Sequence, residues 1–388
     1  MKIVIYWEYF QRYHNARIAA LLQYVKAAEH KVIPVSLSES GHHGHQVERD
    51  SYVDRHAKYL NSTGGIRPID DPAIIKQFIE LLDFEQPDVV SIVGWYGKGT
   101  RAIIRWARMN GKAVVLMLAG SQHDKKRNWL KEAYKRFCFM PKIGAVLCGG
   151  SPHVRYAKSL GMKDTQVFTG YNSVDNDFWA SKATEVRAFP DKFLSEAGMK
   201  PQHYFIAVGR FIEKKNFGAL IEQYAIYREL VGEAAWDLVI VGDGELREIL
   251  EAKISELNLS DCVTLTGYLS SEELAPYMGL AGAFILPSSG YEQWGLVVNE
   301  AMAAGLPVIV SDICGCCEDL VLEGKTGYSF SPSSIDSLSG LMQTMSQDPS
   351  ARNRMANAAG EHIHHYSPEV FAKNFVAACQ CAVGDVIS

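Results

Sequence analysis

Short apolar runs alternate with amphipathic segments along most of this 388-residue chain. The runs predict buried strands, and segments with apolar residues every three to four positions predict helices. In the first half the predicted strands are 3–6, 31–36, 88–93, 113–117, 144–148 and 166–169, and the predicted helices are 15–29, 72–83, 99–110, 127–138 and 152–160. In the second half, strands are predicted near 204, 237, 263, 283 and 307, and helices at 351–365 and 368–382. Strands separated by helices indicate an α/β fold with parallel sheets.

Two stretches depart from this pattern. Residues 37–70 are rich in Ser, Gly, His and Asp without periodicity, and they predict a long loop of the kind that often carries function. Residues 170–202 are of mixed polarity and contain Pro190 and Pro201, so they predict a connection between two domains. The length corresponds to roughly two to three domains of about 150 residues. An apolar content of 47% is enough for sizeable cores.

Composition excludes several classes of protein. No apolar stretch is long enough to span a membrane, and Met1–Tyr6 has the pattern of a first strand rather than a signal peptide. Eight cysteines without repeated spacing favour a reducing compartment over a disulfide framework. We therefore expect a cytoplasmic protein.

The net charge of −5 conceals a basic first half and an acidic second half. Residues 1–180 contain 25 Lys and Arg against 17 Asp and Glu, whereas the remainder contains 14 against 27. Between Lys98 and Lys163 the excess includes Arg101, Arg105 and Arg108 at helical spacing. Such a stripe suits an anionic acceptor, or peripheral contact with the inner face of an anionic membrane at about 1 kcal/mol per basic side chain. An ordinary solvated helix face is the alternative. Nucleic acid is not expected, because no nucleic-acid module is present.

Two glutamates, Glu292 and Glu300, flank a predicted transition from loop to helix. Gly295 precedes a run of helix-forming residues that starts at Leu296, and Gly305 suits the left-handed position that ends a helix. A helix start presents unpaired backbone N–H groups and a positive dipole end, so this one would favour a phosphate. Carboxylates on either side of such a point suit sugar hydroxyl groups.

Two cations, Arg210 and Lys215, follow the predicted strand 204–208 and Gly209. In open parallel sheets, ligands bind outside the carboxyl ends of the strands. Arginine can donate to two phosphate oxygens at once, while lysine acts as a mobile point charge. Together they could neutralise a departing diphosphate without a metal.

With these residues in place, the chain resembles the retaining glycosyltransferases of family 4, which have the GT-B fold. The resemblance rests on five ordered motifs, at 204–217, 241–246, 263–269, 285–312 and 324–327. It implies two Rossmann-like, doubly wound α/β domains with parallel sheets that face each other across a deep cleft. Residues 1–178, joined by a C-terminal helix at 366–388, would form the acceptor-side domain, and residues 179–365 the nucleotide-sugar domain.

The resemblance also implies roles for individual residues. Glu300 would hold the donor ribose, Glu292 would contact the transferred sugar, and the two cations would bind the diphosphate. The remaining donor-binding residues would be Gly209, Gly242, Gly267, Tyr268, Leu269, Gly295 and Leu296. No cofactor is expected, because the nucleotide sugar is itself the donor substrate.

The first half resembles the family more loosely. Where members often carry a glycine-rich loop, this chain has Trp7–Arg17, in which Tyr13, His14 and Arg17 are candidates for the acceptor side. The alternative is capping and packing at a helix start. Trp95 and Tyr96, in a second glycine-containing loop after a predicted strand, are further acceptor-side candidates.

His123 follows the predicted strand 113–117, in a loop with Asp124. Family members often have a histidine or a neighbouring polar group here, near the transferred sugar, so His123 is a candidate catalytic residue. The alternative is a solvated loop histidine.

Three motifs raise the question of a metal, and none predicts one. Asp175-Asn176-Asp177 matches the Asp-x-Asp pattern of another glycosyltransferase fold, but it falls in the predicted connection, away from the cations. His42, His43, His45 and His56 have nonspecific spacing in a polar segment. Cys314-Gly315-Cys316-Cys317 lacks a second cysteine pair, and the resemblance instead places Gly315 near the donor sugar.

The sequence therefore predicts a metal-independent, retaining hexosyltransferase. It would move a sugar from a UDP-sugar, favoured over a GDP-sugar, to a saccharide or lipid-linked acceptor in cell-surface polysaccharide or glycan biosynthesis. Two alternatives stay open: a nucleotide-sugar 2-epimerase of the same fold, and a nucleotide-sugar-binding protein without turnover. Product analysis without acceptor would identify an epimerase, which needs none.

Overall fold

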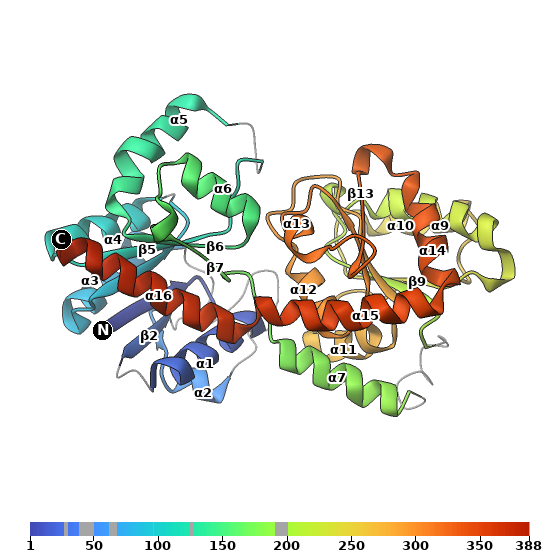
Figure 1. Ribbon diagram of the computed structural model, residues 1–388, viewed down its shortest axis with the longest axis horizontal. Coiled ribbons are helices and arrows are strands. Elements are labelled where there is room, and N and C mark those ends of the chain that lie inside the picture. Colours follow the sequence, from blue (N-terminus) through green and yellow to red (C-terminus); the bar gives the residue numbers. More distant parts are fainter. Residues whose placement is uncertain are drawn as a thin grey trace. The chain divides into compact units, whose positions relative to one another are not determined.

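The chain forms two compact α/β units (Figure 1). The computed structural model describes residues 1–26, 30–38, 50–61, 68–95, 97–123, 127–190 and 201–387. Unit 1 comprises Met1–Asp175 with Tyr366–Ser388, and unit 2 comprises Asn176–His365. The chain thus leaves unit 1 for unit 2 and returns for its last helix.

Unit 1 contains a seven-stranded parallel sheet in the order β3-β2-β1-β4-β5-β6-β7. Its strands are β1 (Lys2–Trp7), β2 (Lys31–Ser36), β3 (Lys58–Tyr59), β4 (Val89–Val93), β5 (Ala113–Leu118), β6 (Ala145–Cys148) and β7 (Val167–Thr169). The chain starts in the middle, winds outward through β2 and β3, then returns beside β1 and winds the other way. Every residue of β5 is buried, as expected for a parallel strand covered on both faces.

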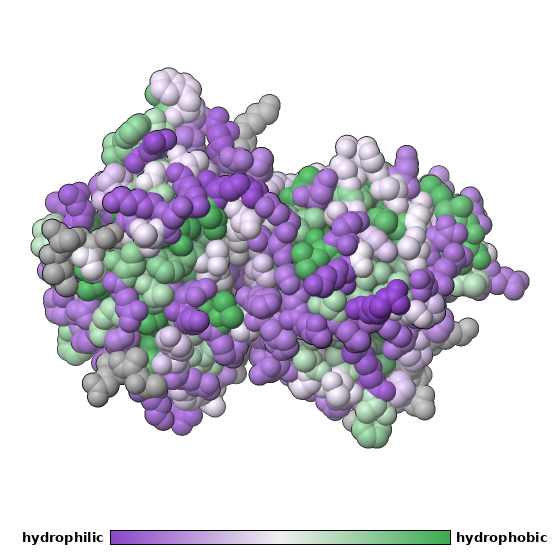
Figure 2. Space-filling view, viewed as in Figure 1, coloured by the Kyte–Doolittle hydropathy of each residue, from purple (hydrophilic) through white to green (hydrophobic). Residues whose placement is uncertain are grey.

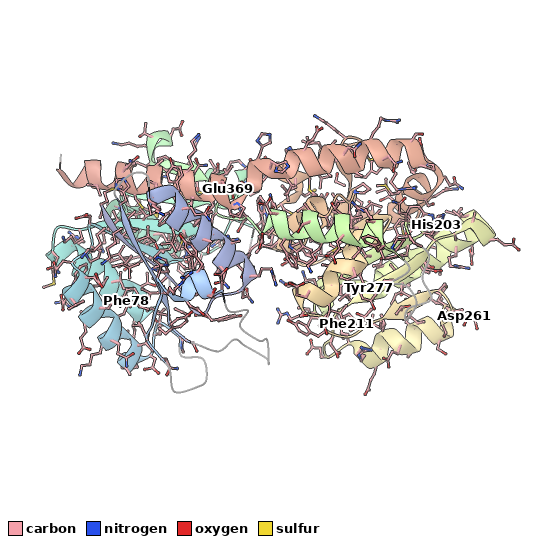
Figure 3. All side chains as sticks on the ribbon, turned by 90° about the horizontal axis from the view of Figure 1, so that it is seen from below. Phe78, His203, Phe211, Asp261, Tyr277 and Glu369 are labelled. Carbon is pink, nitrogen blue, oxygen red and sulfur yellow. The ribbon has the colours of Figure 1, made fainter. Side chains whose placement is uncertain are left out.

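Helices cover both faces of this sheet. One core contains side chains of α3 (Pro72–Glu85), α4 (Lys98–Met109) and α6 (Ser151–Ser159). The opposite core contains side chains of α1 (Arg12–Lys26), α2 (Ser51–Asp54) and α16 (Pro368–Ile387). Phe78 of α3 is completely buried in the first core (Figure 3).

Unit 2 contains a six-stranded parallel sheet in the order β10-β9-β8-β11-β12-β13. Its strands are β8 (Tyr204–Val208), β9 (Asp237–Val241), β10 (Val263–Leu265), β11 (Ala283–Leu286), β12 (Val308–Ser311) and β13 (Gly327–Phe330). Its helices are α7 (Asn176–Ala188), α9 (Phe217–Val231), α10 (Arg247–Glu256), α11 (Ser271–Leu280), α12 (Leu296–Ala303), α13 (Cys317–Leu320), α14 (Ser337–Gln347) and α15 (Pro349–Ile363). Residues of α9, α10 and α14 share one core with Phe211, which is fully buried (Figure 3).

The prediction of two Rossmann-like α/β domains with parallel sheets is confirmed. Both units are Rossmann-like and doubly wound, and the predicted strands of the first half match β1, β2 and β4–β7 within one residue at most ends. The predicted end of the helix at Gly305 and the predicted strand after Pro307 are also confirmed. Gly305 adopts a left-handed φ of 73° just after α12, and β12 starts right after Pro307. Glycine is a reliable signal for the end of a helix, because few other residues adopt a positive φ.

The predicted interdomain connection 170–202 contains the boundary between the two units, after Asp175, and it also contains the thirteen-residue helix α7, which was not predicted. This helix buries Trp179, Ala183 and Val186, and it packs against α11 and α12. Arg187 donates hydrogen bonds to the carbonyl oxygens of Gly279 (2.8 Å) and Ala304 (2.7 Å). A narrow apolar stripe among charged residues gave the mixed polarity that concealed the helix.

Other boundaries differ for local reasons. The segment 37–70 contains α2, capped by the Asp50 carboxylate, and the two-residue strand β3, so it is not all loop. The predicted helix 127–138 divides into α5 (Trp129–Tyr134) and a π-helical turn η2 (Lys135–Phe139), followed by the 3-10 turn η3 (Met140–Lys142). The strand β13 was not predicted, because Gly-Tyr-Ser-Phe has too little apolar character to signal a strand.

The last helix, α16, is part of the core of unit 1. It packs along α1, and Phe371 and Phe375 lie stacked with ring centroids 5.6 Å apart. Both rings are completely buried among side chains of α1 and the sheet. Unit 1 is therefore closed by residues from the end of the chain.

We expect Phe371→Ala to lower the free energy of unfolding by about 3–5 kcal/mol, because it removes a buried ring and leaves a cavity. Lys373→Ala, an exposed position on the same helix, is the matched control and should stay within about 0.5 kcal/mol of wild type. Urea unfolding followed by circular dichroism measures both. If Phe371→Ala lowers the free energy of unfolding no more than Lys373→Ala does, α16 does not hold unit 1 together.

Candidate functional site

The unit 2 sheet has a topological switch point between β8 and β11. These strands are neighbours, but the chain continues from β8 to β9 on one side and from β11 to β12 on the other. The loops that follow β8 and β11 therefore diverge at the same edge of the sheet. Ligands of doubly wound sheets bind at such points.

An ion pair joins these two loops. Nζ of Lys215 lies 2.7 Å from Oε2 of Glu292, and Nζ of Lys214 lies 3.6 Å from the same oxygen. The carbonyl oxygen of Lys214 also accepts hydrogen bonds from the backbone N–H groups of Ser289 (3.0 Å) and Gly290 (3.3 Å). Two segments more than seventy residues apart are thus fixed together by side chains and by backbone.

A glycine, Gly209, and a residue with left-handed backbone, Asn216, allow the Lys215 side chain to reach Glu292. It runs over Gly209, where an added Cβ would lie 3.2 Å from Cε of Lys215. Asn216 adopts a left-handed φ of 57°, which turns the chain sharply from the short turn Glu213–Lys215 into α9. The predicted candidates Gly209 and Lys215 are therefore in direct contact.

The Glu292 side of the pair is held by a second loop. Its carbonyl oxygen accepts a hydrogen bond from the N–H of Gly315 (2.9 Å), and a Cβ on Gly315 would lie 2.0 Å from the carbonyl oxygen of Gln293. Gly295, with a φ of 103°, then turns the chain into α12. Only glycine fits at Gly315 without movement of the backbone. The approach of this loop to a donor sugar stays a prediction.

The other donor-side candidates lie around the same sheet edge. Leu296 is the first residue of α12, and Glu300 lies within that helix with its side chain partly exposed. Gly242 donates its N–H to the carbonyl oxygen of Gly267 (2.9 Å), so the loops after β9 and β10 meet. Donor contact by any of these residues stays a prediction.

Arg210, Tyr268 and Leu269 complete the set of predicted donor residues. Arg210 and Tyr268 are exposed and Leu269 is partly exposed. Arg210 follows β8 directly, whereas Tyr268 and Leu269 follow β10, two strands away in the sheet. The structure therefore places the three at one edge but does not bring their side chains together.

Sequence reasoning missed Asp243, in the loop after β9. Its Oδ1 accepts hydrogen bonds from the N–H of Gly244 (2.8 Å) and Nε of Arg247 (3.1 Å). The backbone N–H of Gly244 is the main cause that lowers the pKa of this carboxyl. The signal was present in Val-Gly-Asp-Gly, since an Asp before Gly often bonds to its own turn.

The three cysteines beside Gly315 are packing residues. Cys314, Cys316 and Cys317 are buried, and burial raises the pKa of Cys314 and of Cys317 to about 12. Burial also raises the pKa of Cys316. The thiols stay protonated at neutral pH and pack as small apolar side chains.

The other metal candidates that the structure describes do not form a cluster. Among the residues that the structure describes, no three His, Cys, Asp or Glu side chains converge as a ligand set. Asp175 precedes α7 and Asp177 lies in its first turn, while His56 bonds to the carbonyl oxygen of Tyr52. His42, His43 and His45 lie outside the described residues.

Unit 1 has a corresponding switch point between β1 and β4, and a cavity of about 290 Å³ lies there. Its lining is mainly aromatic: Tyr6, Trp7, Glu8, Tyr9, Gln11, Tyr13, His14, Ile69, Val93 and Tyr171. The predicted acceptor-side residues Tyr13 and His14 are thus brought together. Sequence reasoning missed Tyr171, because nothing near β7 signals that this residue reaches β1.

His14 is a buried, neutral imidazole. Its ring lies between Trp7 (centroids 4.8 Å apart) and Tyr13 (4.2 Å), and Nδ1 accepts a hydrogen bond from the N–H of Gln11. Burial, and then the charge of Arg17, lowers the pKa of His14 well below its usual value. The ring therefore stays uncharged at neutral pH.

Arg17 and Trp95 are also buried, and both pack against aromatic rings. Arg17 donates two hydrogen bonds to the carbonyl oxygen of Ser173 (3.0 and 2.7 Å) and lies over the ring of Tyr13. Trp95 packs edge-on against Tyr156, 5.5 Å away. Acceptor contact by Arg17 or Trp95 stays a prediction, and Tyr96 lies outside the described residues.

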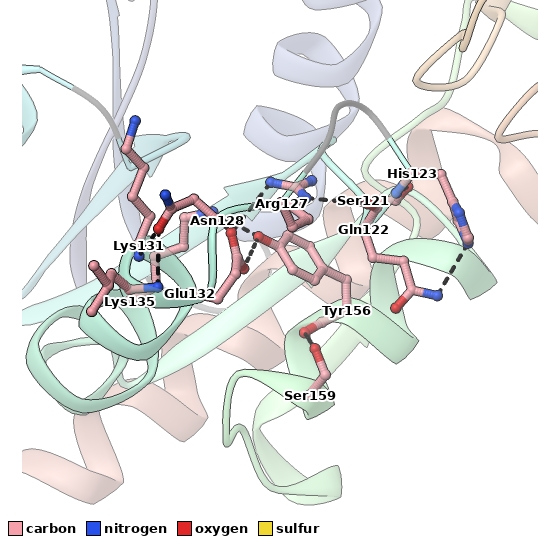
Figure 4. A network of polar contacts seen from close by, with 11 residues as sticks. Ser121, Gln122, His123, Arg127, Asn128, Lys131, Glu132, Lys135, Tyr156 and Ser159 are labelled. Carbon is pink, nitrogen blue, oxygen red and sulfur yellow. Dashed lines mark hydrogen bonds and ion pairs between the residues drawn. The ribbon is translucent and has the colours of Figure 1, made fainter.

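His123 lies in an exposed loop after β5 (Figure 4). Its N–H donates to Oγ of Ser121 (3.1 Å), and its Nε2 lies 3.1 Å from the side-chain nitrogen of Gln122. Nε of Arg127 donates to the carbonyl oxygen of Gln122 (3.2 Å), which ties this loop to the start of α5. A catalytic role for His123 stays a prediction, and Asp124 lies outside the described residues.

Comparison with known families identifies the second unit. Residues 191–362 match the family described as glycosyl transferases group 1. Unit 2 therefore carries a group 1 glycosyl transferase domain. The ion pair of Lys215 and Glu292 and the glycines Gly209, Gly242 and Gly315 all lie within the part of the chain that matches this domain.

Individual relatives agree with this assignment. The chain is 32% identical over 166 residues to the amylovoran biosynthesis glycosyltransferase AmsK of Erwinia amylovora, covering 41% of this chain and 40% of that protein. It is 25% identical over 285 residues to the glycogen synthase of Mycobacterium tuberculosis, covering 72% of this chain and 64% of the synthase. The chain thus spans less than two thirds of the length of these relatives.

The fold of the whole chain also has solved counterparts. The structure of HepE from Anabaena in complex with UDP and glucose superposes with a TM-score of 0.71 over 97% of this chain and 98% of HepE, at 14% sequence identity. At this identity the match concerns the fold, and both Rossmann-like units share in it. Among the described residues, no helix combines the length and apolar character that crossing a bilayer requires.

We expect stability to fall in mild acid because of His14. The unfolded chain binds a proton on this imidazole below about pH 6.5, whereas the folded chain does not, so the free energy of unfolding falls as the pH drops through that value. Between pH 7.5 and 5.5, wild type should lose about 1.4 kcal/mol more than His14→Gln. Urea titrations at both pH values measure the difference.

The matched control is His56→Gln, which removes an exposed imidazole from the same unit and should keep the wild-type loss. Equal acid losses in wild type and His14→Gln would mean that His14 is protonated in the folded protein. The assignment of His14 as a neutral imidazole stacked between aromatic rings would then be wrong.

Proposed function

We propose that the protein is a retaining, metal-independent glycosyltransferase. Its donor would be a nucleotide diphosphate sugar bound by unit 2, and its acceptor a saccharide or a lipid-linked saccharide of cell-surface polysaccharide or glycan biosynthesis. The observation that carries the proposal is the pairing of Lys215 with Glu292 at the switch point between β8 and β11, beside the start of α12.

The pair suits a donor because its two members prefer different parts of the same molecule. The ammonium group of Lys215, with Arg210 and Lys214 nearby in sequence, attracts the diphosphate, as does the positive end of α12. The carboxylates of Glu292 and Glu300 can accept hydrogen bonds from sugar and ribose hydroxyl groups. In the absence of donor, Glu292 neutralises Lys215 and keeps it in place.

In the proposed reaction, the acceptor hydroxyl oxygen forms a bond to the anomeric carbon as the bond from that carbon to the diphosphate oxygen breaks. The electron pair goes to the leaving diphosphate, where Lys215 and Arg210 stabilise the growing charge. Attack on the face from which the diphosphate departs retains the anomeric configuration. The leaving phosphate oxygen accepts the hydroxyl proton, so no protein base is needed.

Uracil is the proposed base of the donor, and unit 1 is the proposed acceptor side. The structure of the HepE complex contains UDP and glucose, which supports a UDP-sugar as the donor. The aromatic cavity of unit 1, with Trp7, Tyr9 and Tyr13, offers flat apolar faces together with hydroxyl groups, which suits a sugar ring.

Lys215→Ala should reduce donor turnover by about a hundredfold or more, because one charge that stabilises the leaving group is lost. Glu300→Gln should weaken donor binding through the ribose. Both effects are measured as the rate and the KM of nucleotide release, with water or a saccharide as acceptor. The donors are UDP-glucose, UDP-galactose, UDP-N-acetylglucosamine and GDP-mannose.

Arg354→Ala removes an exposed cation from the same unit, outside the five motifs, and serves as the control, with activity expected to stay at the wild-type level. If the Lys215→Ala protein is folded and turns over donor at the wild-type rate, the pair of Lys215 and Glu292 does not stabilise the leaving diphosphate.

Nucleotide binding should be selective and should depend on the same site. We expect UDP, but not GDP, ADP or TDP, to raise the melting temperature, since ligand at about a hundred times its Kd adds roughly 2.7 kcal/mol. Differential scanning fluorimetry measures the shift in wild type and in Lys215→Ala. A melting temperature that rises with GDP alone would make guanine the donor base. An equal rise in wild type and Lys215→Ala would mean that the nucleotide binds away from Lys215.

A further inference from the structure

One face of unit 1 combines exposed aromatic side chains with a high density of cations. This α4–α5–η2 surface consists of Arg101, Arg105, Arg108, Met109, Trp129, Leu130, Lys131, Tyr134, Arg136 and Phe137. Its elements lie together, because residues of α4, α5 and η2 line a common groove. None of these side chains belongs to the switch points of the two sheets.

The apolar members are among the most exposed large side chains of the described residues. Trp129 is 75% exposed, Met109 75% and Phe137 72%, and Leu130 and Tyr134 are more than half exposed. Figure 2 shows pale and green side chains among purple ones over the part of unit 1 that Figure 1 labels α5. Apolar groups gathered in this way on a protein surface usually mark an interaction site.

The charge of this region is almost entirely positive. Residues 98–142 contain twelve Lys and Arg but only two acidic residues, Asp124 and Glu132. Within the described parts of the chain, Arg101, Arg105 and Arg108 form no ion pair with an acidic side chain. The field outside this face is therefore available to an anionic partner.

Glu132 does not offset that field, because the fold neutralises it internally (Figure 4). Its Oε1 lies 2.8 Å from Nζ of Lys135 and 3.7 Å from a guanidinium nitrogen of Arg127, and its Oε2 accepts a hydrogen bond from the Tyr156 hydroxyl (2.7 Å). Lys135 is itself buried, and its Nζ lies 4.6 Å from the ring centre of Trp95. This network fixes α5 and η2 to α6 while their outer side chains stay exposed.

A groove of about 500 Å³ lies within the surface, between α4 and the η2–η3 segment. Its lining is half basic and half apolar or aromatic: Arg101, Ile104, Arg105, Arg108, Met109, Tyr134, Phe139 and Lys142. Four cations around one groove suit a phosphate, and the adjoining apolar side chains suit the start of a hydrocarbon chain.

We propose that the α4–α5–η2 surface docks on a bilayer that contains anionic phospholipid. The groove would take a lipid phosphate, the surrounding Arg and Lys side chains would face neighbouring headgroups, and Trp129, Leu130, Tyr134 and Phe137 would enter the boundary between headgroups and acyl chains. Tryptophan and tyrosine favour that boundary, and basic residues around an apolar face are typical of proteins that lie on membranes.

A soluble polyanion explains these observations less completely. Anionic saccharide or nucleic acid would account for the arginines, but it offers little to Met109, Leu130 and Phe137, whose exposure to water costs free energy. An anionic bilayer accounts for both the charge and the apolar side chains. Membrane docking does not depend on glycosyl transfer, so it can be tested without a sugar donor.

Flotation of the full chain with vesicles tests the proposal directly. We expect binding to vesicles of phosphatidylcholine with phosphatidylglycerol, binding that weakens as salt is raised, and little binding to phosphatidylcholine alone. Binding that is the same for both kinds of vesicle, or absent from both, would overturn the proposal. A preference for soluble dextran sulfate over the anionic vesicles would assign the surface to a polyanion instead.

Two double variants separate the charged and apolar contributions. Arg105→Gln/Arg108→Gln should weaken vesicle binding about 25-fold, at roughly fivefold per cation. Lys325→Gln/Arg354→Gln makes the same change of charge in unit 2 and should leave binding unchanged. Trp129→Ser/Phe137→Ser should also weaken vesicle binding, whereas Phe189→Ser/Ile249→Ser, at exposed apolar positions of unit 2, should not.

Trp129 provides a signal for the surface itself. The other six tryptophans are at most 9% exposed, so an external quencher reaches mainly Trp129. Anionic vesicles should protect this fluorescence from acrylamide, brominated lipid should quench it, and Trp129→Phe should remove both effects. Quenching by brominated lipid that persists in Trp129→Phe would place the contact on another face and overturn the proposal.

Discussion

The ion pair between Lys215 and Glu292 is the contact on which the candidate site depends. It joins the loop after β8 to the loop after β11, the two points where the chain leaves the sheet in opposite directions. Its members are largely removed from water, so loss of one would leave the other charge poorly compensated. The glycines around it follow from this geometry: Gly209 lies under the lysine stem, and Gly315 lies against the backbone beside Glu292. Bulk at either position would separate the loops.

The same constraint explains how much of the site the sequence could reveal. Arg210, Lys215, Glu292 and Gly295 were found because parallel strands end at one edge and because glycine and helix-forming residues mark the start of α12. The direct contact of Lys215 with Glu292 was not foreseen, since it needs the order of the strands, in which β8 and β11 are neighbours although β9 and β10 lie between them in the chain. Pairing across a sheet is not encoded in local periodicity.

The elements that were missed share a physical cause. The helix α7 has a narrow buried stripe, β13 is short and contains Gly and Ser, and β3 has two residues, so none has a pattern long enough to identify it. Each is stabilised by tertiary contacts, such as the hydrogen bonds of Arg187 to two neighbouring helix ends. The π-helical turn η2 interrupts a helix whose sequence gave no break, and Lys135, the first residue of η2, is buried against Trp95 and Tyr156.

Charge is handled in opposite ways inside and outside unit 1. His14 is held neutral between aromatic rings, and Arg17 and Lys135 are buried against rings and oxygen acceptors. The fold therefore supplies partners for these buried groups. The arginines of α4 lie in solvent without acidic partners among the described residues. A stretch this basic raises self-repulsion in the folded state, a cost that an anionic partner would relieve.

Unit 2 presents the converse problem. It contains 13 Lys and Arg against 26 Asp and Glu, a net charge of −13, which would repel both an anionic membrane and a nucleotide diphosphate. Three of its 13 cations fall within the six residues 210–215, at the end of β8. A diphosphate site in so acidic a unit requires such a local concentration of positive charge, because at physiological salt the distant carboxylates are screened beyond about 8 Å while the adjacent lysines are not. The unit as a whole would be held away from an anionic surface, whereas its switch point can still attract an anionic ligand.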